Sequence, residues 1–185
     1  MTSHWKQRLS EVLRESRRLA FVGVGQDLRG DDAAGILLVR RLQQRAAEDV
    51  DSTDSPEKEN SPLSPRKQKV ILERSAERLY FEAGSLPEAS AGPLRRFGPD
   101  FVIFLDAAQM GEGPGTVGWI EPGQIDDGSA STHTFPMGGF AEYLSTELGC
   151  RVAVLGIQPE QMEFDAPATE QVLRAIEEIA ARIAG

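Results

Sequence analysis

Short apolar runs that alternate with stretches of helical periodicity constrain the fold of this chain more than any other feature. Five runs are typical of buried strands, at residues 19–25, 79–83, 101–105, 116–120 and 152–157. The run at 116–120 is the weakest and is flanked by glycine, which indicates an edge strand. Residues 33–47, residues 139–148 and the segment from about Glu170 onward repeat apolar residues at the spacing of a helix. This alternation predicts an α/β sandwich with a mostly parallel sheet.

The chain is long enough for one domain, which we place over residues 1–185. Trp5, Leu9, Val12 and Leu13 would share one face of a helix, so we expect an extra N-terminal helix within residues 1–17. Residues 48–69 contain three prolines and almost no apolar side chains. Such a segment buries too little apolar area to offset the entropy of ordering it, so we predict a flexible polar insertion there.

Charge and composition exclude several classes of protein. The net charge is −9, which opposes binding to nucleic acid. The single cysteine, Cys150, cannot form a disulfide framework or a cysteine zinc site within one chain, and we expect it to be a small buried residue. No apolar stretch is long enough to cross a bilayer, and the N-terminus lacks the apolar core of a secretory signal. We therefore expect a cytoplasmic protein without a nucleic-acid or membrane partner.

Three polar segments follow predicted strands, where open α/β sheets bind ligands. They contain the pair Asp31 and Asp32, the residue Asp106, and His133. Two carboxylates and one imidazole suit a borderline divalent metal such as nickel or zinc, with a coordination position left for a further ligand. Simpler roles exist for each residue: an N-cap accounts for Asp31 or Asp32 but not for both, Asp106 could cap a strand end, and a loop histidine is commonly structural.

Nucleotide binding is disfavoured at the first of these segments. Gly23 and Gly25 could begin a dinucleotide fingerprint, but Leu28 stands where the third glycine belongs. Asp31 and Asp32 would then repel a phosphate at the helix N-terminus.

Four segments, taken in order, are similar to one known family. They are Val22–Gly35 with its Gly-Asp-Asp, Phe104–Gly111 with Asp106, Thr132–Pro136 with His133, and Leu155–Pro159. Together they resemble the hydrogenase maturation endopeptidases, and most of all the branch that processes the large subunit of formate hydrogenlyase-type nickel–iron hydrogenase. The resemblance extends from about Leu19 to the C-terminus and leaves out the polar insertion.

This resemblance implies both an activity and a fold. The protein would be an aspartyl-type endopeptidase that removes the C-terminal extension of a nickel-loaded hydrogenase large-subunit precursor. Asp32, Asp106 and His133 would be the catalytic residues and the nickel ligands, with nickel supplied by the substrate and no resident cofactor. The implied fold is a three-layer α/β/α sandwich around a mostly parallel five-stranded sheet, of the phosphorylase/hydrolase-like type. We expect a monomer whose partner is the precursor.

Two departures from the family pattern leave alternatives open. Gln26 stands where asparagine is usual, and Ala33 replaces a glycine that matters if the backbone there needs a positive φ. A non-catalytic chaperone that recognises the nickel-loaded precursor, and a resident-metal peptidase of other specificity, are therefore retained as alternatives. Either nickel or a carboxylate could activate the attacking water. Gly84 and Ser85 could line a peptide cleft or simply pack against a helix.

Overall fold

The computed structural model describes residues 4–51, 69–72, 76–124 and 137–185 of the chain. The strands are β1 (Arg18–Val24), β2 (Lys69–Leu72), β3 (Glu77–Gly84), β4 (Phe101–Ala107), β5 (Val117–Ile120) and β6 (Arg151–Ile157). The α-helices are α1 (His4–Glu15), α2 (Ala34–Asp51), α3 (Ala91–Phe97), α4 (Met137–Leu148) and α5 (Glu170–Ala184). Three short 3-10 helices are η1 (Gly30–Ala33), η2 (Pro87–Ser90) and η3 (Pro122–Gln124).

The strands form one mostly parallel sheet in the order β2-β3-β1-β4-β6-β5. The four central strands β3, β1, β4 and β6 are parallel to one another, and β5 pairs antiparallel with β6 at one edge. All five predicted strands are present, and the edge position predicted for residues 116–120 is confirmed. A sixth strand that we did not predict, β2, pairs antiparallel with β3 at the opposite edge.

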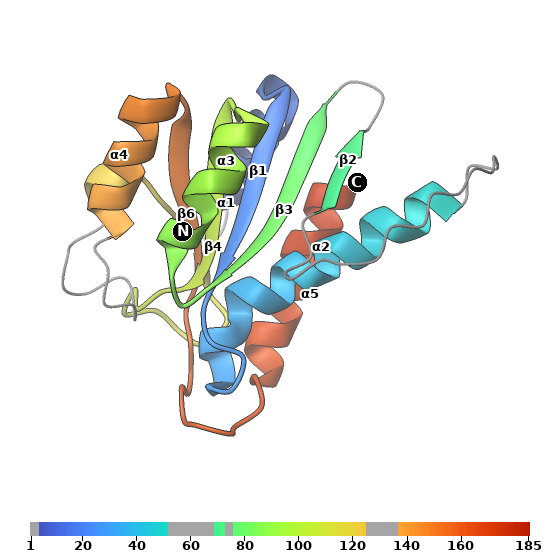
Figure 1. Cartoon of the computed structure of the whole chain (residues 1–185). Helices are drawn as coiled ribbons and strands as arrows, with labels where there is room; N and C mark the ends of the chain where they lie inside the picture. The colour runs from blue at the N-terminus through green and yellow to red at the C-terminus, as the bar shows by residue number, and fades with distance from the viewer. Residues whose placement is uncertain (1–3, 52–68, 73–75, 125–136) are drawn as a thin grey trace.

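Helices cover both faces of this sheet, which confirms the predicted three-layer sandwich (Figure 1). Alternate residues of each central strand point to opposite faces, so that Phe21 and Val22, or Ile103 and Phe104, belong to different clusters. One cluster joins a sheet face to α1, α2 and α5. The other joins the opposite face to α3 and α4. Burial on both sides explains why β1 and β4 are continuous apolar runs in the sequence.

One helix is longer than predicted, and one short helix was not predicted. The helix predicted over residues 33–47 begins one residue later and continues to Asp51, into the segment assigned to the polar insertion. Helix α3 was not predicted, because its sequence AGPLRRF has only seven residues and contains Gly92 and Pro93. Most of the insertion, residues 52–68, lies outside the described residues. Within the described ranges, no helix combines the length and the apolar character needed to cross a membrane.

Candidate active site

Asp32 and Asp106 lie at the carboxyl end of the central strands. Asp106 is the next-to-last residue of β4, and its side chain is buried. Asp32 is in η1, the single 3-10 turn that links the loop after β1 to helix α2, and it is also buried. Strands β1 and β4 are neighbours, and η1 packs against β4. Two carboxylates from distant parts of the sequence are therefore placed at the same end of the sheet, as the topology predicted.

Gly35 brings the start of α2 against the ends of both strands. A Cβ atom on Gly35 would overlap the carbonyl oxygens of Leu105 in β4 and Val24 in β1. The Leu105 carbonyl directly precedes Asp106 in the chain, and Gly35 follows Asp32 by three residues. The glycine thus permits the backbone contact that holds the Asp32 turn beside the Asp106 strand.

Gly25 makes the turn that leads from β1 to this site. Its φ is 139°, a conformation that favours glycine, and a Cβ atom there would overlap the carbonyl oxygen of Asp32. The backbone N–H of Gln26 donates to that same oxygen at 3.3 Å. At the other side of the turn, the N–H of Gly25 donates to the carbonyl of Gly84 at 3.0 Å. The backbone of Asp32 is therefore tied to the ends of β1 and β3.

Asp31 has a different role from Asp32. Its side chain is fully buried, and its Oδ2 accepts the N–H groups of Glu160 at 2.8 Å and Gln161 at 3.1 Å. Its Oδ1 accepts the N–H of Thr169 at 2.6 Å, and the Thr169 hydroxyl lies 3.0 Å from both oxygens. Thr169 is the residue that precedes α5. The carboxylate of Asp31 thus anchors the loop between β6 and α5, which leaves Asp32 as the chemical candidate of the pair.

Arg40 fixes the exposed part of the loop after β1. Its guanidinium makes two hydrogen bonds of 2.8 Å to the carboxylate of Asp27 and two, of 2.9 and 3.1 Å, to Glu82 on β3. These bonds, those to Asp27 most strongly, raise the pKa of Arg40 further above its already high ordinary value. The pair of carboxylates around one arginine connects the loop to both α2 and β3.

The remaining predicted residues have mixed outcomes. His133 lies outside the described residues. Ala33 lies in η1, and outside glycine only Asp165 has a positive φ in the described part of the chain, so the alanine is compatible with this turn. The side chain of Ser85 is exposed. Cys150 is buried, as predicted, and burial raises the pKa of its thiol, which disfavours a reactive thiolate.

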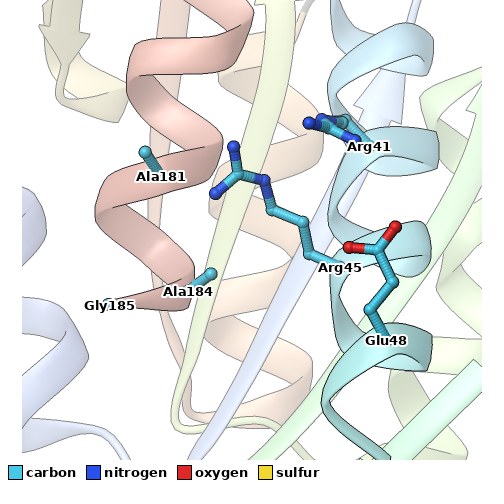
Figure 2. Close-up of a pocket in the computed structure, with 6 residues that line it drawn as sticks. All are labelled: Arg41, Arg45, Glu48, Ala181, Ala184 and Gly185. Carbon is cyan, nitrogen blue, oxygen red and sulfur yellow. The ribbon is translucent and has the colours of Figure 1, made fainter. Parts of the chain in front are cut away.

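A pocket between α2 and α5 lies away from these aspartates. Figure 2 shows that its lining comes from Arg41, Arg45 and Glu48 of α2 and from the last turn of α5, with Arg45 directed toward α5. The pocket residues of α2 are at least about 10 Å along the helix axis from its first residue, next to the aspartate turn. Arg41 and Arg45 pair there with Glu177. In the described ranges, no group of three or more His, Cys, Asp or Glu side chains is placed to hold a metal ion.

Comparisons with known proteins agree with this fold and with the sequence motifs. A family model named HycI, hydrogenase maturation protease, matches residues 68–185, which include the positions of Asp106 and His133. A protein of Methanocaldococcus jannaschii whose name assigns it to the hydrogenase maturation proteases is 30% identical, with 90% of this chain and 86% of that protein covered.

Two further relatives extend the similarity. The hydrogenase 3 maturation protease of Escherichia coli K12 is 28% identical, with 88% of this chain and 86% of the relative covered. The crystal structure of the [NiFe] hydrogenase maturation protease HycI from Thermococcus kodakarensis superimposes with a TM-score of 0.75, at 25% identity and with 96% of each chain covered. The resemblance inferred from the four motifs is confirmed, and the chain is a peptide hydrolase that belongs to the hydrogenase maturation protease family.

Proposed function

We propose that this protein is the endopeptidase that removes the C-terminal extension of a nickel–iron hydrogenase large-subunit precursor after nickel insertion. The observation that carries the proposal is the placement of two buried carboxylates, Asp32 and Asp106, at the carboxyl end of the sheet in a chain of this family. Buried carboxylates gain most when a cation arrives to offset their charge. A metal that comes with the substrate would provide that cation only when the precursor is ready to be cut.

In this proposal, nickel is part of the substrate and no resident cofactor is required. Asp32 and Asp106 would contribute oxygen ligands and His133 a nitrogen ligand, a set that suits nickel. The role of His133 rests on the family resemblance alone. Binding of the loaded metal would fix the scissile peptide bond in register with the site, so that only a correctly loaded precursor is positioned for hydrolysis.

The chemical step is hydrolysis of one peptide bond. Water adds to the carbonyl carbon, the C–N bond breaks, and the departing nitrogen takes up a proton. Asp32 or Asp106 could accept the proton of the attacking water as a general base, or the substrate's nickel could polarise the carbonyl oxygen as a Lewis acid. In both routes the carboxylates must be ionised and held in place, which the backbone contacts around η1 accomplish for Asp32.

Substitution of the two aspartates tests the proposal. Asp32→Ala should abolish cleavage of nickel-loaded precursor, measured by mass spectrometry, with little change in melting temperature. Asp106→Asn should also abolish it, whereas a mere strand-end cap would tolerate asparagine. Asp27→Asn is the matched control, because Asp27 lies on the same loop but is paired with Arg40 on the surface. Full activity of Asp32→Ala would refute its role as a ligand.

The same experiment separates the alternative functions. A chaperone would bind the loaded precursor without changing its mass, and the fit of Ala33 in η1 removes one of the two sequence departures that suggested this alternative. A resident-metal peptidase would contain stoichiometric metal after purification, which elemental analysis detects. We further propose that the enzyme acts as a monomer in the cytoplasm, and light scattering of the purified protein tests the first point.

A further inference from the structure

Two exposed apolar side chains lie on adjoining loops at the carboxyl end of the sheet. Phe164, in the loop between β6 and α5, is 71% exposed, and Leu28, in the loop between β1 and η1, is 55% exposed. The N–H of Asp165 donates to the carbonyl of Leu28 at 2.7 Å, so the two loops are in direct contact. Both loops are at the same end of the molecule in Figure 1. We define Leu28 and Phe164 as the apolar rim.

The loop that carries Phe164 is held firmly in place. Besides the four groups that donate to the carboxylate of Asp31, the N–H of Gly30 donates to the carbonyl of Ala166 at 3.1 Å, and the N–H of Asp31 to that of Gln161 at 2.9 Å. The residue after Phe164, Asp165, has a φ of 61°, in the left-handed region that aspartate tolerates better than most side chains. An aromatic side chain on a loop whose backbone is already held loses less entropy on binding than one on a mobile loop, which suits an anchoring residue.

The apolar rim is linked to the candidate active site through the chain and through hydrogen bonds. Leu28 and Asp32 are in the same connection between β1 and α2, four residues apart. The loop of Phe164 is bonded to Asp31, the immediate neighbour of Asp32. The two loops that carry the apolar rim therefore adjoin the turn that holds Asp32, so a polypeptide bound at Asp32 and Asp106 can also contact the rim.

Charge around the rim is negative. The loop residues 158–169 contain Glu160, Glu163 and Asp165 and no lysine or arginine. All three carboxylates are on exposed residues, and none forms an ion pair with any residue in the described ranges. Arg29 is the basic residue of the adjoining loop, and it donates to the carbonyl of Met162. A partner that covers Phe164 would be favoured if it carried positive charge beside an apolar side chain.

We propose that the apolar rim and its three carboxylates form a docking surface for the hydrogenase large-subunit precursor. This surface is separate from the site at which the peptide bond is cleaved. The surface takes an apolar side chain of the precursor that is flanked by lysine or arginine. This inference rests on the proposed function, because the precursor is the polypeptide that the site must admit. Docking there supplies affinity that does not depend on nickel, while the buried carboxylates test whether nickel is present.

Two measurements test the apolar contact separately from cleavage. One is the Kd of the nickel-free precursor, and the other is kcat and KM for cleavage of the nickel-loaded precursor. Phe164→Ala should raise both the Kd and the KM about tenfold and leave kcat within about twofold. Phe164→Leu should recover part of the affinity. Leu173→Ala is the matched control, since Leu173 is an exposed apolar residue of α5 outside the two loops, and it should change neither value.

A second set of variants tests the charge. The triple variant Glu160→Gln, Glu163→Gln, Asp165→Asn removes three charges, and asparagine keeps the left-handed φ at position 165. It should weaken binding and reduce the salt dependence of the Kd between about 0.02 and 0.3 M ionic strength. Glu15→Gln, Glu142→Gln, Glu178→Gln makes the same change of net charge elsewhere on the surface and should bind as the wild type does.

The outcomes distinguish the two proposals. If the wild type binds the precursor but does not shorten it, the proposed function is wrong. The Kd values of the variants then still test the docking surface. Wild-type affinity in Phe164→Ala and in the triple variant, both with unchanged circular dichroism, overturns the docking surface and leaves the proposed function standing. If the wild type neither binds nor cuts either form of the precursor, both proposals are wrong.

Discussion

At the scale of single residues, the adjacent acids Asp31 and Asp32 show how much a local sequence leaves undetermined. The pair reads as one motif, and a helix cap could account for either member. In the structure, Asp31 accepts hydrogen bonds from a loop about 130 residues further along the chain. No spacing rule connects two segments so far apart, so the structural role of Asp31 had to come from the fold.

Asp31→Asn should therefore destabilise the protein. Each oxygen of Asp31 accepts a backbone N–H, and an amide group would turn its own N–H toward one of these buried donors. An unsatisfied buried donor costs about 1–3 kcal/mol, so we expect a loss of about 2 kcal/mol and a melting temperature lower by roughly 4–8 °C. Thermal unfolding followed by circular dichroism measures this. Asp27→Asn, which breaks an exposed ion pair, should change stability by less than about 1 kcal/mol. Equal melting temperatures for the two variants would contradict the anchoring role.

At the scale of secondary-structure elements, the long and well-patterned segments were predictable and the short ones were not. All five strands with continuous or alternating apolar residues appear within two residues of their predicted bounds. Strand β2 was not predicted because it has only four residues, KVIL, and they adjoin a polar segment. Helix α3 was not predicted because a glycine and a proline occupy its first turn and only Leu94 and Phe97 are buried. Short elements such as these are stabilised by tertiary packing, which a local pattern does not record.

Gly35→Ala tests the close approach of α2 to the sheet. A methyl group there would overlap two carbonyl oxygens, and backbone atoms cannot rotate away as a side chain can. Helix α2 would have to move from β1 and β4, so we expect a loss of about 3 kcal/mol or more in urea unfolding, together with loss of cleavage as Asp32 is displaced. Gly139→Ala is the matched control in α4, where a Cβ atom meets nothing within 4 Å. That variant should gain about 0.5–1 kcal/mol from helix propensity. Wild-type stability of Gly35→Ala would show that the contact is not tight.

At the scale of the whole molecule, the sheet topology explains how Asp32 and Asp106 reach the same end of the sheet, which the motifs alone do not explain. Asp32 and Asp106 are separated by two strands, three helices and the polar segment, and no sequence distance relates them. The order β3-β1-β4-β6 makes β1 and β4 neighbours, so residues that follow them are brought together. The sequence predicted this because parallel strands with helical crossovers share one carboxyl edge. The sequence could not predict which other loop would pack beside the site. That depends on the contact between loops 25–29 and 158–169, which forms only in the folded chain.

Helix α1 provides a test of whether the chain unfolds as one unit. Trp5 of α1 is in the same apolar cluster as β4, β6, α2 and α5, and Arg8 pairs with Glu121 just beyond β5. The N-terminal helix is thus part of the core packing, and its loss would expose a sheet face. We expect its unfolding to coincide with that of the sheet, as in a two-state domain.

Because the chain has two tryptophans, Trp119→Phe leaves Trp5 as the fluorescent reporter of α1, and Trp5→Phe leaves Trp119 as the reporter of β5. In each variant, the fluorescence midpoint in urea should equal the far-ultraviolet circular dichroism midpoint. A Trp5 transition at clearly lower urea than the circular dichroism transition of the same variant would show instead that α1 is a loosely attached appendage.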